Sequence, residues 1–279
     1  MSVAPPRLSV DRDAPLGVFD SGLGGLTVVR ALRERVPNES VIYLGDTARV
    51  PYGTRSPETV IRYALGCARV LTERGVKAIV VACNTVSAVA IDMLRVELDL
   101  PVLGVIGPGA RAAVASSQGA PVGVLATTGT IASGAYPRAV AALSTRIEVF
   151  GQPAPLLVAL AEEGWLEGEV PRLVVRRYLE PLIAAGAHTV VLGCTHFPLL
   201  KGTIESEAAQ LAGHAVPVVD SASACADEVG AFLRDRGLAT TRTTPGDLDL
   251  LVTDIPKSFA IVASRFLGRE IGGVTAIDL

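Results

Sequence analysis

The sequence contains little cysteine, histidine, lysine or aromatic residue, and each shortage excludes a class of protein. Four cysteines in 279 residues are too few for a disulfide scaffold. The sequence has no CxxC pair, and its 3 histidines do not show the spacing of a structural zinc site. Lysine occurs only at Lys77, Lys201 and Lys257, outside any strand-end motif, so a Schiff base with pyridoxal phosphate has no obvious anchor. The 25 Lys+Arg nearly balance the 28 Asp+Glu, which argues against nucleic-acid binding through a basic face.

Long hydrophobic runs and an export signal are missing as well. Although 49% of the residues are hydrophobic, runs such as Ala78 to Cys83 are far shorter than the about 18 to 20 residues that span a bilayer. The same hydrophobic content, with a net charge of −3, excludes a disordered chain and predicts no membrane partner. Residues 1–14 lack the apolar core of a secretory signal, so we expect a disordered leader, a cytoplasmic location and reduced thiols.

Short apolar runs alternate with helical patterns along the chain. The stretch 56–75 is typical of a helix, because Ser56 can cap it, Pro57 occupies its first position and Gly75 ends it. Continuous apolar strands separated by helices predict an α/β fold with mostly parallel sheets flanked by helices. The expected strands lie at 16–20, 40–46, 77–83, 101–106, 121–127, 188–194 and 216–221.

An internal repeat adds to this picture. Residues 75–85 (GVKAIVVACNT) align without gaps with 186–196 (GAHTVVLGCTH), at an offset of 111 residues. Each match alone is weak, but three in the same order and at nearly the same offset predict a duplicated α/β unit. The other two matches pair 15–22 with 121–128 and 101–106 with 217–222.

The repeat places Cys83 and Cys194 at the ends of equivalent strands. Ligands of open α/β sheets bind beyond the carboxyl ends of the strands, and a following helix N-terminus lowers the pKa of a thiol below about 8.5. We therefore interpret both residues as reactive thiols, the alternative being buried thiols that the duplication preserved. Cys67 and Cys225 are interpreted as core residues.

The glycine-rich turn at 19–32 (FDSGLGGLTVVRAL) has two interpretations. As a dinucleotide-binding fingerprint it is incomplete, because Thr27 stands where the third glycine belongs. Alternatively, backbone N–H groups at the helix start could hold a substrate carboxylate together with Ser21. Asp20 is then either a turn residue or an ionised group that adjusts the nearby thiol.

Further polar residues follow other strands. Tyr52 and Gly53 could close a pocket over a ligand or belong to a plain loop. Thr127 and Thr130 stand at a strand end, where their hydroxyls suit a carboxylate or ammonium group or cap a helix.

Two opposed thiols suit one kind of chemistry. A thiolate on one face of an α-carbon removes its proton while a thiol on the other face returns one, which inverts the centre without a cofactor. Such a weakly acidic proton requires a dry site in which catalytic groups are held in place. The residues therefore suggest a two-base racemase.

Several motifs between residue 17 and about residue 200 resemble those of glutamate racemases, cofactor-independent members of the aspartate/glutamate racemase superfamily. They are GVFDSGLGGLTVVR, YLGDTARVPYG, VVACNT, ATTGTIASGAY, LVALAEEG and LGCTHFPLL. His196 favours glutamate, because aspartate racemases tend to have CTE instead of CTH. The resemblance implies a homodimer that supplies D-glutamate for peptidoglycan. It also implies two α/β domains, 15–106 plus 219–279 and 107–218, with the active site between them.

The resemblance assigns roles position by position. It implies that Cys83 acts on D-glutamate and Cys194 on L-glutamate, assisted by Asp20 and His196 respectively, with neither metal nor cofactor. Asp46 and Glu162 fall on auxiliary acidic positions, although GQPAPLLVALA before Glu162 departs from the Cys-Pro pattern of many members. The implied substrate contacts are Asp20, Ser21, Tyr52, Gly53, Asn84, Thr85, Thr127, Thr130, Thr195 and His196.

Three other functions remain open at this point. A racemase or decarboxylase for another small acid would share the two thiols. A Rossmann-type oxidoreductase would use the GLGG turn and bind NAD(P). A non-catalytic pair of periplasmic-type binding domains would leave both cysteines unexplained.

Overall fold

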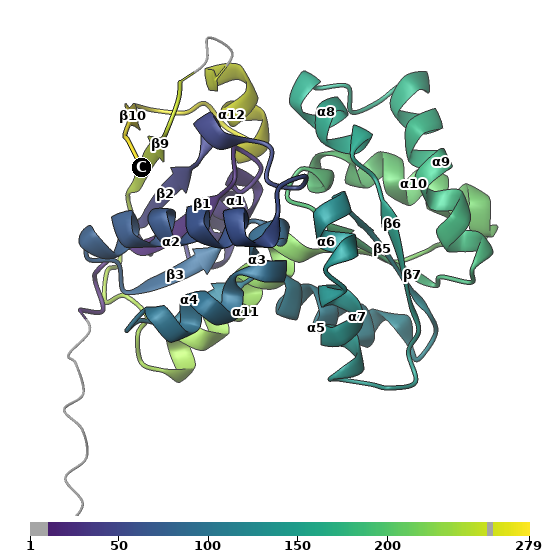
Figure 1. Ribbon diagram of the computed structural model, residues 1–279, viewed down its shortest axis with the longest axis horizontal. Coiled ribbons are helices and arrows are strands. Elements are labelled where there is room, and N and C mark those ends of the chain that lie inside the picture. Colours follow the sequence, from purple (N-terminus) through teal and green to yellow (C-terminus); the bar gives the residue numbers. More distant parts are fainter. Residues whose placement is uncertain (1–10, 256–258) are drawn as a thin grey trace, which may run out of the picture.

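The computed structural model describes residues 11–255 and 259–279, so most of the expected leader, residues 1–10, lies outside the described residues. The carboxylate of Asp13 accepts hydrogen bonds from the N–H of Thr241 and the hydroxyl of Thr240. Two parallel sheets lie side by side, each flanked by helices (Figure 1). This arrangement confirms the predicted α/β class. Across the described ranges, no helix is long and apolar enough to cross a membrane.

The first sheet contains six strands in the order β10-β9-β2-β1-β3-β4, and every paired strand is parallel to its neighbours. Four come from the beginning of the chain and two from its end, which returns to add β9 beside β2. The strands are β1 (Leu16–Asp20), β2 (Val41–Gly45), β3 (Ala78–Val81), β4 (Val102–Gly104), β9 (Leu248–Val252) and β10 (Val274–Ala276).

The second sheet repeats the central part of the first. Its order, β6-β5-β7-β8, is that of β2-β1-β3-β4, and its pairs are also parallel. The register is repeated as well: Leu16 pairs with Ala78 in the first sheet, and the aligned Val122 pairs with Thr189 in the second. The predicted duplication is thus confirmed in topology and register. The strands are β5 (Val122–Ala126), β6 (Val149–Pro153), β7 (Thr189–Gly193) and β8 (Val218–Asp220).

Helices cover both faces of the first sheet, because alternate strand residues point to opposite sides. Leu16 and Val18 pack with residues of α1, α11 and α12, whereas Phe19 packs with α2. The helices are α1 (Leu26–Arg35), α2 (Pro57–Glu73), α3 (Asn84–Val89), α4 (Ile91–Glu97), α5 (Ile106–Ser117), α6 (Thr128–Ala132), α7 (Ala135–Ala141), α8 (Leu156–Glu163), α9 (Glu169–Ala184), α10 (Lys201–Ala212), α11 (Ser221–Asp235) and α12 (Phe259–Leu267), with the 3-10 helices η1 (Thr47–Arg49) and η2 (Phe197–Leu200).

Helix α2 begins where its sequence predicts. The Ser56 hydroxyl accepts a hydrogen bond from the N–H of Thr59, and Pro57 occupies the first turn, where a missing N–H costs nothing. Cys67 faces inward from this helix and is fully buried, as is Cys225 on α11, which confirms both as core residues.

A buried ion pair lies where the strands of the first sheet begin. The Nζ atom of Lys77, just before β3, donates to the Glu39 carboxylate and, at 2.6 Å, to the carbonyl of Arg12. The other carboxylate oxygen of Glu39 accepts the N–H of Thr240 at 2.8 Å. Because the strands are parallel, this pair is at the opposite end of the sheet from Cys83.

Candidate active site

The loops that follow β1, β3, β5 and β7 line a cavity of about 260 Å³. This volume falls below the about 300 to 1,000 Å³ of sites for drug-sized ligands and suits a smaller molecule. Both sheets therefore contribute the carboxyl ends of their strands to one site, as expected for α/β folds. The predicted residues that line it are Ser21, Tyr52, Gly53, Cys83, Asn84, Thr85, Thr127, Glu162, Cys194, Thr195 and His196.

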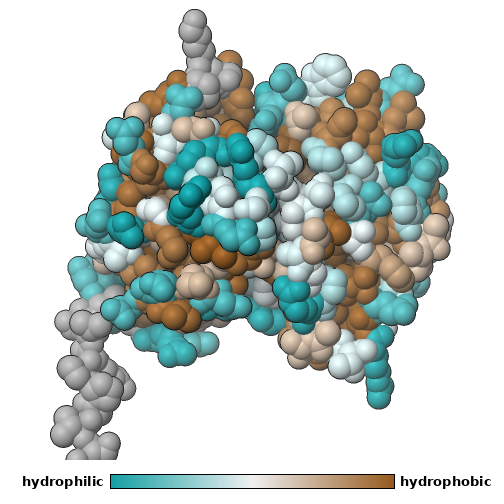
Figure 2. Space-filling model, viewed as in Figure 1, coloured by the Kyte–Doolittle hydropathy of each residue, from teal (hydrophilic) through white to brown (hydrophobic). Residues whose placement is uncertain are grey.

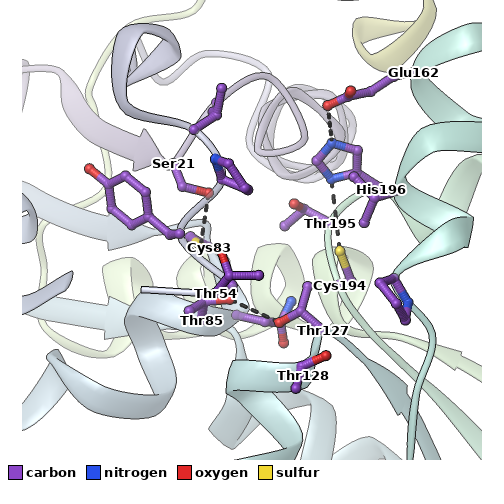
Figure 3. Close-up of a pocket in the computed structure, with 18 residues that line it drawn as sticks. Ser21, Thr54, Cys83, Thr85, Thr127, Thr128, Glu162, Cys194, Thr195 and His196 are labelled. Carbon is purple, nitrogen blue, oxygen red and sulfur yellow. Dashed lines mark hydrogen bonds and ion pairs between the residues drawn. The ribbon is translucent and has the colours of Figure 1, made fainter. Parts of the chain in front are cut away.

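The two predicted thiols lie on opposite sides of this cavity (Figure 3). Cys83 follows β3 and caps α3, and its Sγ is 3.3 Å from the Ser21 hydroxyl oxygen. Cys194 follows β7, and its Sγ is 3.8 Å from Nδ1 of His196. Both side chains are free thiols and are almost entirely buried, so the sulfur atoms are shielded from bulk water.

The expected lowering of the thiol pKa is wrong for Cys83. Burial raises the pKa of this thiol to about 12, and the negative charge of Asp20 raises it too. Hydrogen bonds from Ser21 and from the N–H of Val86 act in the opposite direction, but they do not overcome the loss of solvation. Because α3 has only 6 residues, its N-terminus offers limited compensation.

Alkylation of Cys83 by iodoacetamide is expected to be slow at about pH 7.5 and to keep accelerating beyond about pH 10. Only the thiolate reacts, and a pKa of about 12 leaves the thiol mostly protonated throughout this range. An unperturbed thiol, with a pKa of about 8.5, levels off before about pH 10. Peptide mass spectrometry with N-acetylcysteine as internal control measures both rates. A Cys83 rate that levels off below about pH 9 contradicts the raised pKa.

His196 links Cys194 to Glu162. While its Nδ1 faces the Cys194 sulfur, its Nε2 is 3.1 Å from Oε1 of Glu162 (Figure 3). Burial lowers the pKa of His196, but the hydrogen bonds with Cys194 and Glu162 raise it more, to about 10. The bond to His196 also lowers the pKa of Glu162. The raised pKa of His196 favours its imidazolium form and the lowered pKa of Glu162 favours its carboxylate, which places a proton donor beside the sulfur.

Asp20 is buried behind the cavity lining. Its Oδ2 accepts the N–H groups of Gly22, at 3.1 Å, and Gly25, at 3.0 Å. Asp20 thus occupies two N–H groups of this turn, in agreement with its interpretation as a turn residue, and these two are not free to hold a substrate carboxylate. Its Oδ1 has no hydrogen-bond partner within the described part of the chain, and its charge acts on both Cys83 and His196.

Gly24 explains why this turn needs glycine. A Cβ atom at this position would lie 2.5 Å from Nδ1 of His196 and would also overlap the Thr195 hydroxyl. The turn after β1 therefore packs directly against the residues that follow Cys194. Thr27 adds a hydrogen bond across the same contact, from its hydroxyl to the Thr195 carbonyl at 2.9 Å.

Hydroxyl groups form another wall of the cavity. The Thr85 and Thr127 hydroxyls are 3.1 Å apart, and Thr130, which is buried just behind them, is 3.1 Å from Thr127. Thr127 also caps α6, so the helix-cap interpretation is correct for it. The Asn84 Oδ1 accepts from Tyr136, while its buried Nδ2 has no partner in residues 11–255 and 259–279. This wall presents several groups that could donate hydrogen bonds to a carboxylate.

Tyr52 is fixed from below by Asp46. The Tyr52 hydroxyl donates to Oδ2 of Asp46, which also accepts from Nε of Arg49 at 2.6 Å, while Oδ1 accepts from the Thr253 hydroxyl at 2.9 Å. Asp46 is fully buried and does not line the cavity. The carbonyl of Gly53 accepts the N–H at the start of α6, at 3.0 Å, so this loop closes the cavity between the two sheets.

Sequence reasoning missed part of the lining. Thr54 and Thr128 are next to predicted residues, so the reasoning that selected hydroxyl groups near strand ends could also have selected them. Pro155 and Val158 come from the start of α8, where an ordinary apolar helix pattern gives no functional signal. Within the described ranges, no three His, Cys, Asp or Glu side chains gather in a way that could hold a metal ion.

Comparison with known proteins agrees with this geometry. Residues 25–229 match the Asp/Glu/Hydantoin racemase family. A glutamate racemase from Neisseria meningitidis serogroup C is 48% identical over 272 residues, covering 97% of this chain and 99% of the relative. The crystal structure of a Francisella tularensis glutamate racemase in complex with D-glutamate has a TM-score of 0.87 at 36% identity, covering 96% of this chain and 98% of the other. A Bacillus anthracis glutamate racemase isoform matches with a TM-score of 0.90, the same identity and the same coverage. The chain belongs to the Asp/Glu/hydantoin racemase family, and within it to the glutamate racemases.

Proposed function

We propose that this protein interconverts L-glutamate and D-glutamate without a cofactor, and so supplies D-glutamate for peptidoglycan synthesis. One observation carries the proposal: two free thiols at equivalent positions of a structural repeat face a small cavity from opposite sides. Membership of the glutamate racemases supports the choice of substrate.

In the proposed reaction, the Cys83 sulfur, as thiolate, takes the α-proton of D-glutamate while the Cys194 thiol gives a proton to the opposite face. The product is L-glutamate. Its new α-proton comes from Cys194, and the α-proton of D-glutamate resides on Cys83. The roles reverse for L-glutamate. His196 assists on the Cys194 side, where its imidazolium faces the sulfur. Asp20 and Ser21 assist on the Cys83 side.

Substrate binding must lower the barrier to forming the Cys83 thiolate, because burial disfavours it in the free protein. The ammonium group of an amino acid supplies a positive charge that favours a nearby thiolate. Among the described residues, no lysine or arginine lines the cavity, so carboxylates are held by neutral donors such as Thr85, Thr127 and Asn84. His196 adds positive charge to the site, while its two ring nitrogens face Cys194 and Glu162.

The purified protein, incubated with L-glutamate in D₂O without added cofactor, is expected to lose optical rotation and to incorporate deuterium at Cα. Circular dichroism and proton NMR follow the two changes. If neither occurs while the protein is folded, the proposal fails. The same assay with L-aspartate tests a racemase for another small acid, and saturable NAD(P) binding would favour the oxidoreductase.

We further propose two domains, 15–106 plus 219–279 and 107–218, and a homodimer that works in the cytoplasm. The separate hydrogen bonding of the two sheets supports a division into two domains, and the pairing of β8 with β7 extends the second sheet to Asp220, two residues beyond the proposed boundary. Hydrophobic and hydrophilic residues are interspersed on the face shown in Figure 2, and exposed apolar side chains near α9, such as Trp165 and Leu173, offer surface for a partner. The need for free thiols supports a reducing compartment.

A further inference from the structure

Helix α12, near the end of the chain, contacts both partners of the ion pair between His196 and Glu162. Arg265 donates from Nη1 to the carbonyl of Glu162 and, at 3.3 Å, to that of Ala161. The next residue, Phe266, is fully buried and meets the His196 ring edge-on, with 4.9 Å between the ring centroids. Two consecutive residues of one helix thus touch the two members of the pair.

The contact of Arg265 is a helix cap supplied by a distant segment. Ala161 and Glu162 belong to the last turn of α8, at the negative end of its dipole, where the Ala161 carbonyl also accepts the N–H of the capping residue Gly164 at 3.2 Å. A guanidinium satisfies these carbonyls and complements the dipole. Gly164, in the left-handed conformation with φ of 78°, leaves room for it, since a Cβ there would lie 2.5 Å from Cζ of Arg265.

This cap fixes the part of α8 that carries Glu162. The Glu162 side chain is half exposed, with 50% of its surface accessible, so its own packing does not fix its position. Arg265 adds a hold on the backbone from α12, whose residues share a buried cluster with Ala161, whereas Leu157 and Leu160 of α8 pack with Cys194 around the second sheet. The carboxylate then meets Nε2 of His196, whose Nδ1 faces Cys194.

We propose that Arg265 is a positioning residue for the proton transfer at Cys194, acting through Glu162 and His196. Phe266 supports it by limiting the tilt of the imidazole ring. The inference rests on the proposed function, because it concerns one of the two thiols of that reaction. In this proposal, α12 influences proton transfer at Cys194 only, since Cys83 contacts Ser21 and the start of α3 instead.

The test compares Arg265→Met with Arg35→Met in the full chain. Arg35 forms an exposed ion pair with Asp227, so its loss is expected to leave the rate unchanged. Arg265→Met is expected to lower kcat by about tenfold, because small displacements of catalytic groups are costly. Arg265→Lys keeps a cationic donor and should recover part of the rate. In a Glu162→Gln background, Arg265→Met should have little further effect, since both substitutions disrupt the same path.

Isotope effects distinguish positioning from general damage. If the step at Cys194 becomes slower, the effect of deuterium at Cα on kcat/KM grows for L-glutamate, which Cys194 deprotonates, and shrinks for D-glutamate. Equal isotope effects in wild type and Arg265→Met, or a rate loss that persists undiminished in the Glu162→Gln background, would overturn the inference. If the wild-type protein does not racemise glutamate, the proposed function fails instead, and this comparison is not reached.

Discussion

Replacing either Cys83 or Cys194 by serine is expected to lower the rate of glutamate racemisation by on the order of 10³-fold, or about 4 kcal/mol in activation free energy. A serine hydroxyl occupies nearly the same space but is a much weaker acid than a thiol, so it cannot exchange protons with Cα at a useful rate. Because each thiol serves one face of the substrate in the proposed reaction, loss of either one is expected to block inversion in both directions.

The two variants should differ in the exchange they retain. In D₂O, Cys194→Ser keeps Cys83 and is expected to exchange the α-proton of D-glutamate slowly, without inversion. Cys83→Ser is expected to do so with L-glutamate instead. Proton NMR of each enantiomer, with circular dichroism to follow inversion, measures both reactions.

Cys225→Ala is the matched control, because Cys225 is a fully buried thiol on α11 that does not line the cavity. Far-ultraviolet circular dichroism first verifies that this control is folded. Near-normal racemisation in Cys83→Ser or Cys194→Ser would refute the two-base assignment. Exchange of both enantiomers by the same single-thiol variant would refute the assignment of one face to each thiol.

The second large effect concerns stability. Lys77→Met is expected to reduce the free energy of unfolding by about 3 to 5 kcal/mol, because it leaves the Glu39 carboxylate buried without its cation. The Lys77 side chain is completely buried and that of Glu39 is 4% exposed, so water cannot replace the lost partner. Urea denaturation followed by circular dichroism measures the change.

The double variant Lys77→Met/Glu39→Leu separates the charge from the packing. Removing both ions is expected to recover most of the lost stability, since no charge remains buried alone. Arg35→Met, which breaks an exposed pair, should cost less than about 1 kcal/mol. Because the buried pair lies at the end of the sheet away from the cavity, kcat of folded Lys77→Met should remain close to wild type. A loss below about 1 kcal/mol for Lys77→Met would contradict the argument.

The fold was predictable where local pattern and burial agree. The apolar runs that end in Cys83 and Cys194 could be aligned because both strands are buried on both faces. Such burial favours a continuous run of apolar residues in each strand. The ends of these strands then indicated the site. The pattern of a single strand does not give the order of strands in a sheet. The spacing of the repeat, however, indicated that the two sheets share one arrangement of strands.

The remaining features depend on contacts between distant segments. The raised pKa of Cys83 results from burial and from Asp20, neither of which a strand-end position reveals. Asp46 carries an acidic side chain in a promising motif, yet it is packed beneath Tyr52 rather than in the cavity. The bond from Arg265 to α8 joins residues about a hundred positions apart, so no local sequence pattern could have indicated it.

The matching register of the two sheets has a consequence for the origin of the site. A single ancestral unit with one thiol at a strand end, paired face to face with an identical copy, would already have placed one thiol on each side of a shared cavity. Fusion of two such copies into one chain would then allow each half to change independently. Aligned positions differ in this way: Thr85 in the first half corresponds to His196 in the second, and Ser21 corresponds to Thr127. The two thiols thus occupy matching positions of the repeat, whereas the groups that surround them differ between the halves.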